Sequence, residues 1–148
     1  MLRQGSIHGH EALWLESDLV RVTVLPRKGA DVYELVHKPS GIDFLLKTPQ
    51  GLRPPGALPP ADFLENYEGG WQVLFPSGGD PCTYRGRAMP FHGEVATLPW
   101  EWTVERDDAA ETALRLEVRC RLIPFRLERT LRVRTGEATL RVEQRVTN

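Results

Sequence analysis

The chain has 148 residues, of which 41% are hydrophobic and 26% charged, and its formal net charge is −1. This composition is typical of one globular domain spanning residues 1–148. The balanced charge excludes the basic surface of a protein that binds nucleic acid or an anionic membrane. No apolar run approaches the ~20 residues of a membrane-spanning helix.

The N-terminal segment lacks the continuous apolar stretch of a signal peptide. The two cysteines, Cys82 and Cys120, have no CxxC spacing, so we expect reduced thiols rather than a disulfide. Together these features predict a cytoplasmic protein.

Alternation of apolar and polar residues predicts β-strands early in the chain. The first covers residues 20–24 and ends at the LPRKGA turn. A second covers 32–37, and the KPSG sequence closes a hairpin onto a third strand over 42–46. The Pro- and Gly-rich stretch 49–60 is interpreted as a surface loop, and the residues over 61–67 are compatible with a short helix.

The clearest alternation lies near the end of the chain. Residues 114–122 place leucine, valine and cysteine on one face and arginine and glutamate on the other. The pattern continues over 125–133, where Arg129 interrupts it, and over 140–146 after the TGEA turn. Strands with one buried and one solvated face are typical of antiparallel sheets. We therefore expect a mainly β fold, an antiparallel β-sandwich.

The segment 69–102 is too rich in glycine, proline and tryptophan to be regular core, and it carries His92. Histidine titrates near neutral pH, so it gives or takes a proton readily. Gly93 lets a ligand or a neighbouring backbone approach closely. The alternative is that His92 is a partly buried histidine whose ring is satisfied by a backbone carbonyl.

Aromatic and arginine side chains of the same segment are candidate ligand contacts. Trp71, Trp100 and Trp102 offer flat apolar faces on which the C–H face of a sugar ring docks, although core packing is the commoner role of tryptophan. Arg85 and Arg87 carry forked donors suited to hydroxyl oxygens. For the arginines the alternative is a solvated loop.

The carboxylates nearest to His92 in the sequence are candidates for a general base. They are Glu65, Glu68, Asp80 and Glu94. Glu94 shares a face with His92 if both lie in a strand. A solvated surface position is the alternative for each of the four.

Motifs for metals and cofactors are missing from the sequence. His8 and His10 have an i, i+2 spacing, but no third ligand stands near them, so we expect no metal. There is no GxSxG, P-loop, GxGxxG or HExxH motif. We expect no cofactor.

Taken in order, these segments resemble the aldose 1-epimerase (galactose mutarotase-like) family. The opening LWLESDLVRVTVLPRKGADVYELVHKPSGIDFLL is similar to the first hairpins of that family. GGWQVLFPSGG is similar to its GG-W-x-x-x-F-P-x-G-G segment, and PFHGEVATLPWEW to its HG…W segment. IPFRLERTLRVRTGEATLRVEQRVTN is similar to the strands that follow and that end at V-x-N. The likeness covers nearly the whole chain in the right order.

The resemblance implies a galactose mutarotase-like β-sandwich that interconverts the α and β anomers of a free sugar through a histidine and a carboxylate. It implies that His92 is catalytic and that Arg87 and Trp71 line the sugar pocket. Arg85 and Glu94 are further candidates for substrate binding. The partner implied is a monosaccharide, with no metal or other cofactor.

In the family, the second histidine and the catalytic glutamate come after the V-x-N motif, which here ends at Asn148. We therefore expect the chain to match the N-terminal half of such a domain. Exposed strand edges and an apolar face would then favour self-association or a complementing chain.

Two functions other than catalysis stay open. One is a non-catalytic carbohydrate-binding or sugar-sensing module that keeps the pocket without the base. The other is a structural β-domain whose apolar faces pair with another chain.

Overall fold

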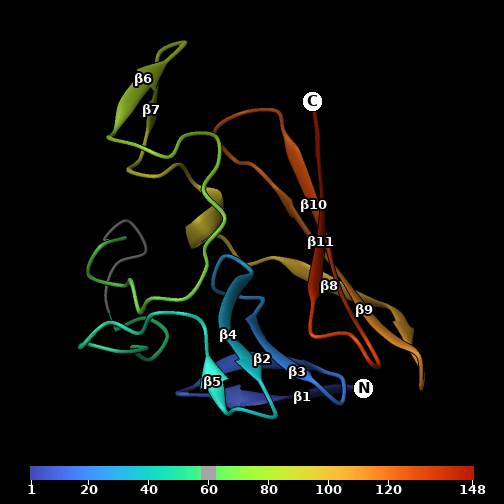
Figure 1. Ribbon diagram of the computed structural model, residues 1–148. Coiled ribbons are helices and arrows are strands. Elements are labelled where there is room, and N and C mark those ends of the chain that lie inside the picture. Colours follow the sequence, from blue (N-terminus) through green and yellow to red (C-terminus); the bar gives the residue numbers. More distant parts are fainter. Residues whose placement is uncertain (58–62) are drawn as a thin grey trace.

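A computed structural model, which describes residues 1–57 and 63–148, contains two antiparallel sheets and a separate hairpin (Figure 1). The first sheet has the order β1 (Leu2–Ile7), β2 (His10–Glu16), β3 (Val20–Leu25), β4 (Asp31–His37) and β5 (Ile42–Asp43). The second has the order β11 (Leu140–Thr147), β10 (Arg126–Arg134), β9 (Glu111–Arg119) and β8 (Glu101–Asp107). The hairpin consists of β6 (Cys82–Tyr84) and β7 (Arg87–Met89), and one 3₁₀ turn, η1 (Val95–Thr97), follows it. The predicted mainly β, antiparallel fold is confirmed.

One apolar core lies between the two sheets. Its fully buried members include Leu13, Leu15, Val22, Val24, Trp100, Leu114, Leu116, Leu127 and Leu131. Burying one such side chain stabilises the fold by roughly 1.5–3 kcal/mol. The indole N–H of Trp100 donates to Val95 O at 3.0 Å, which joins η1 to this core. Figure 1 shows the β6–β7 hairpin projecting away from both sheets.

The strands predicted over 20–24, 32–37 and 140–146 are confirmed by β3, β4 and β11. The alternation does not predict β2, because both of its faces are covered: Leu13 and Leu15 enter the main core, and Ala12 packs in a second cluster on the other face. Residues 12–15 are therefore apolar without a break, and β2 lacks the alternation by which a strand is recognised in the sequence.

Two predicted strands end earlier than expected. β5 stops at Asp43 rather than residue 46, because the Asp43 carboxylate accepts the backbone N–H groups of Leu35 and Leu45 at 3.0 and 3.1 Å. β9 stops at Arg119 rather than residue 122. The helix considered over 61–67 lies partly outside the described residues, and 63–66 form a turn.

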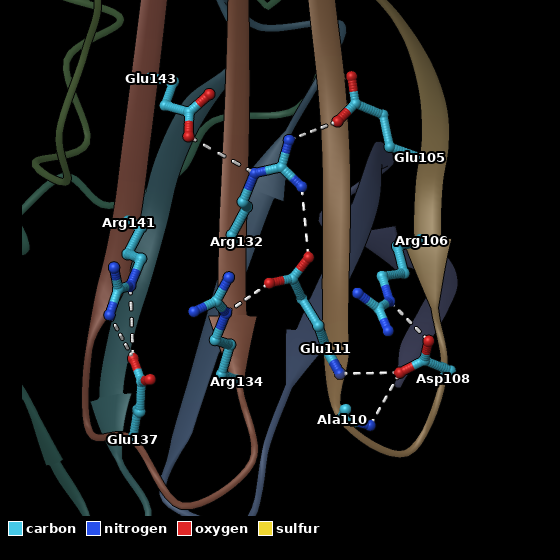
Figure 2. Close-up of polar contacts among 10 residues, drawn as sticks. All are labelled: Glu105, Arg106, Asp108, Ala110, Glu111, Arg132, Arg134, Glu137, Arg141 and Glu143. Atoms are coloured by element: carbon cyan, nitrogen blue, oxygen red, sulfur yellow. Dashed lines mark hydrogen bonds and ion pairs between the residues drawn. The ribbon is translucent and has the colours of Figure 1, made fainter.

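The outer face of the second sheet is a lattice of arginine and glutamate side chains (Figure 2). Arg132 contacts Glu105, Glu111 and Glu143 at 2.8, 3.3 and 3.8 Å. Glu111 also pairs with Arg134 at 2.5 Å and, unlike Glu105 and Glu143, has a side chain only 5% exposed.

In the described residues no helix is long and apolar enough to cross a membrane.

We expect replacement of Glu111 to destabilise the protein in a pH-dependent way. The hydrogen bond from Arg134 holds the pKa of Glu111 below its usual value. Its stabilising effect is therefore present above the pKa of the unfolded state and is lost as the pH falls below about 4. Glu111→Gln should lower the melting temperature at neutral pH, and the difference from wild type should narrow in acid.

Glu137→Gln is the control, because Glu137 pairs at 3.0 Å with Arg141, whose side chain is 53% exposed. It should change the melting temperature much less. A Glu111→Gln difference that is unchanged in acid would contradict this prediction.

Candidate functional site

His92 lies in a turn between β7 and η1 that is bonded to the preceding loop. Its N–H donates to Gly79 O at 2.9 Å. The carbonyl of Phe75 accepts the N–H groups of Glu94 and Val95 at 3.0 and 3.4 Å. His92 has φ 62°, in the left-handed region. Such strain in a residue other than glycine is common where a side chain must be aimed at a ligand.

Gly93 makes this turn possible. It has φ 74°, and a Cβ at this position would lie 2.2 Å from Phe75 O. No side chain fits there without moving the backbone. The conformation of Gly93 therefore determines where His92 lies.

The His92 ring is half-buried between aromatic side chains. Its centroid is 4.9 Å from that of Phe63, perpendicular to it, and 3.7 Å from that of Phe91. Its Nδ1 is buried and has no hydrogen-bond partner among the described residues. The backbone carbonyl expected of a purely structural histidine is therefore not found at Nδ1.

The carboxylate of Glu94 is buried and hydrogen-bonded to the backbone, so it is not free to act as a base. It is 5% exposed, and its two oxygens accept the backbone N–H groups of Arg121 and Leu122 at 2.7 and 3.0 Å. Arg87 donates to Leu122 O at 3.0 Å. Glu94 and Arg87 thus fix the loop that contains Arg121 and Leu122.

Burial, together with the nearby Glu94, raises the pKa of the Cys120 thiol in that loop to about 11.

Arg85 and Arg87 line a cavity of about 450 Å³ beside the β6–β7 hairpin. Arg85 is exposed, with its guanidinium 5.4 Å from the centroid of the Tyr84 ring. Neither Trp71 nor His92 lines this cavity. The structure does not bring these two arginines together with the predicted tryptophan and histidine.

Trp71 lies beside β4 and covers a buried arginine. Its backbone exchanges hydrogen bonds with Val32 at 2.9 and 3.1 Å, and its ring is 4.7 Å from the guanidinium of Arg129. Arg129 is 2% exposed, and burial lowers its pKa to about 10. Its Nε and Nη1 have no partner among the described residues. In the sequence, the signal for this contact between Trp71 and Arg129 was that Arg129 interrupts the apolar face of the strand predicted over 125–133.

The other tryptophans of this segment have structural contacts. Trp100 is fully buried in the core, and the Trp102 indole N–H donates to Glu11 Oε1 at 3.1 Å. His10 Nε2 contacts Arg53 O at 2.8 Å. Within the described part of the chain, no group of three or more His, Cys, Asp and Glu side chains is arranged to hold a metal.

A buried ion cluster, formed by Lys28, Asp31 and Glu68, lies between the β3–β4 turn and the segment before Trp71. Lys28 Nζ contacts Asp31 Oδ2 at 3.1 Å and also contacts Glu68 Oε2. Both carboxylates are fully buried. Burial raises the pKa of Asp31 well above its usual value; Lys28 opposes this shift and Glu68 adds to it.

Lys28 also lines a cavity of about 290 Å³, which we call the Lys28 cavity. Other lining residues are Glu11, Phe63, Tyr67, Gln72 and Thr97. Phe63 contacts the His92 ring and also forms a wall of this cavity. His92, Phe63 and Lys28 are thus connected through one aromatic side chain. The volume is at the small end of the range of ligand pockets, which suits a small molecule.

Sequence reasoning missed Lys28, Phe63 and Gln72. Lys28 and Glu68 are 40 positions apart, so no local pattern connects them. Glu68 was one of four candidate carboxylates. Glu68 and Glu94 are both buried, but only Glu68 contacts Lys28 at the cavity.

Comparison with known proteins identifies the fold. No family model matches the sequence, and no curated protein does. The structure is similar to that of the mutarotase candidate YeaD from Salmonella typhimurium, with TM-score 0.67 and 17% identity over 90% of this chain and 43% of that one. It is also similar to a galactose mutarotase-like protein from Clostridium acetobutylicum, with TM-score 0.60 and 15% identity over 89% and 45% of the two chains. The chain spans less than half the length of either structure, and it has the galactose mutarotase-like fold.

Gly93→Ala should destabilise the protein more than Gly86→Ala. The two glycines have nearly the same φ, 74° and 75°, so both alanines bear a left-handed strain of roughly 1–2 kcal/mol. Only at Gly93 does the new Cβ meet backbone, whereas nothing lies within 4 Å at Gly86. Chemical denaturation measures the difference, which overpacking predicts at roughly 1–3 kcal/mol. Equal losses would contradict the close approach of Gly93 to Phe75.

Because Asp31 is buried, we expect the free energy of unfolding to fall as the pH rises. Because the pKa of Asp31 is raised in the folded state, the native protein binds a proton that the unfolded chain releases above about pH 4. The free energy of unfolding of wild type, relative to Asp31→Asn, should therefore decrease from about pH 4 upward until Asp31 ionises in the folded state. Asp80→Asn, at an exposed position, is the control. A relative stability that increases with pH would mean that pairing with Lys28 outweighs burial.

Proposed function

We propose that this chain carries the histidine-bearing part of a site that interconverts the α and β anomers of a free sugar, as an aldose 1-epimerase does. The observation that carries the proposal is His92, whose buried Nδ1 has no described partner and whose ring contacts the wall of the Lys28 cavity. The fold shared with two mutarotase-like structures supports it.

Anomer exchange is a proton-transfer reaction. A base takes the proton of the C1 hydroxyl, an acid protonates the ring oxygen, and the C1–ring oxygen bond breaks to give the open aldehyde. After rotation about C1–C2 the same steps run in reverse and restore both proton carriers. The reaction needs two groups placed around one hemiacetal, and we assign one of these roles to His92.

The surroundings of His92 fit this role. Near neutral pH an imidazole accepts a proton, and the imidazolium that results can donate one. The backbone hydrogen bonds of the left-handed turn fix the position of the His92 backbone, and the rings of Phe63 and Phe91 pack against its imidazole. Phe63 and Tyr67, stacked with ring centroids 6.0 Å apart, offer apolar faces to the C–H groups of a sugar.

His92→Ala should abolish acceleration of anomer exchange. We would follow freshly dissolved α-glucose and α-galactose by NMR with purified protein, and expect a rate above buffer that falls about 10²- to 10⁴-fold in the variant, as for loss of a general acid or base. His37→Ala is the control, because His37 is the last residue of β4 and its ring contacts Ser40 in the β4–β5 turn. Circular dichroism checks that both variants fold.

Three other outcomes would contradict the proposal in different ways. Exchange that survives in His92→Ala would remove His92 from the reaction. Saturable sugar binding without exchange would indicate the carbohydrate-binding alternative. Neither binding nor exchange would contradict a sugar function altogether.

A further inference from the structure

Three cations line the Lys28 cavity: Arg27, Lys28 and Arg53. Such a set suggests an anionic ligand, for example a sugar phosphate. Whether it forms an anion site depends on how many of the charges are already balanced by carboxylates, because a phosphate requires a net positive site with several converging donors.

Each of the three cations is paired with acidic groups. Arg27 contacts Glu101 at 2.9 Å and Glu11 at 3.4 Å, and Glu11 itself lines the cavity. Arg53 lies 3.9 Å from the Glu65 carboxylate.

Lys28 contacts both carboxylates of the buried ion cluster. Even with Asp31 protonated, Glu68 alone balances this lysine. The described lining of the cavity therefore has no excess positive charge.

Lys28 keeps one donor for a ligand. An ammonium group has three N–H bonds, and Asp31 and Glu68 accept two of them. The side chain is 18% exposed, at the cavity wall. A single fixed donor with its charge balanced suits a hydroxyl or a ring oxygen better than a phosphate.

Uncharged polar groups complete the lining. The hydroxyl of Thr97 donates to Glu94 O at 3.0 Å, so its oxygen can still accept a hydrogen bond from a sugar hydroxyl. Gln72 adds an amide that is held to Gly69 O at 2.5 Å. With the stacked Phe63 and Tyr67, the cavity combines an aromatic wall with neutral and charge-balanced polar groups.

We propose that the Lys28 cavity binds an uncharged monosaccharide, with Lys28 as the donor to a sugar oxygen, and that it disfavours phosphorylated sugars. The inference takes the sugar as ligand from the function proposed above and adds the class of sugar and the residue that contacts it.

The test compares binding of galactose and galactose 6-phosphate at one ionic strength, by calorimetry or NMR titration. Galactose should bind about tenfold more tightly, the difference expected when a charged group is desolvated without a free partner. Lys28→Met should weaken galactose binding about tenfold. Because this variant leaves two buried carboxylates without their cation, a second variant that keeps the fold is needed.

That second variant is Glu101→Gln. The Glu101 side chain is 78% exposed. Its loss removes one of the two carboxylates that pair with Arg27 and makes the surroundings of the cavity more positive by one charge, so affinity for the 6-phosphate should rise several-fold relative to galactose. Glu143→Gln is the matched control: it is 73% exposed and pairs with Arg132 on the outer face of the second sheet (Figure 2). It should leave the ratio of the two affinities unchanged.

The outcomes separate this inference from the proposed function. The inference would be overturned if the 6-phosphate binds more tightly than galactose or if neither sugar binds. It would also be overturned if Glu101→Gln and Glu143→Gln change the ratio of the two affinities equally. Loss of anomer exchange in His92→Ala with the 6-phosphate preferred would overturn it while the proposed function stands. Tighter binding of galactose than of the 6-phosphate, without anomer exchange, would contradict the proposed function while this inference stands.

Discussion

The buried ion cluster of Lys28, Asp31 and Glu68 is the interaction on which the candidate site depends. Two carboxyl groups with no solvent exposure are tolerated because one ammonium group contacts both and because burial raises the pKa of Asp31, which favours its uncharged form. Removing the partner of a buried charge typically costs about 3–5 kcal/mol. The cluster joins the β3–β4 turn to the segment before Trp71. There, Gly69 and Gly70 bring the backbone against Leu46 O and Val32 O, where a Cβ would lie at 2.0 and 2.8 Å. The position of the Lys28 cavity follows from these contacts.

His92 is held by a second, independent set of contacts made by the backbone. Phe75 O accepts two N–H groups of the turn, and Glu94 anchors the neighbouring loop through the N–H groups of Arg121 and Leu122. The two sets meet at Phe63, which contacts the His92 ring and lines the cavity. Irregular connecting segments are thereby held in place around the candidate site, and loops on a rigid sheet scaffold are where binding and catalytic residues are common.

The sequence predicts strands in which apolar and polar residues alternate, such as β3 and β11, and the fold class with them. It does not predict β2, in which residues 12–15 are apolar without a break. His92 can be recognised in the sequence as a candidate site residue because it stands in an irregular loop rich in glycine and proline. The buried ion cluster is not recognisable, because Lys28 and Glu68 come from separate turns that only the folded chain brings together. For the same reason the sequence places Arg85 and Arg87 with Trp71, whereas the structure puts the arginines at a different cavity.

The central claim is that His92 and the Lys28 cavity form one sugar site. Titration of ¹⁵N-labelled protein with galactose, followed by amide chemical shifts, tests it most directly. Binding of galactose at one site should give saturable shifts with one affinity at Lys28, Gln72 and Thr97 and at His92. Shifts confined to the β6–β7 hairpin and the loop at Arg121 and Leu122, or different affinities at His92 and Lys28, would contradict it.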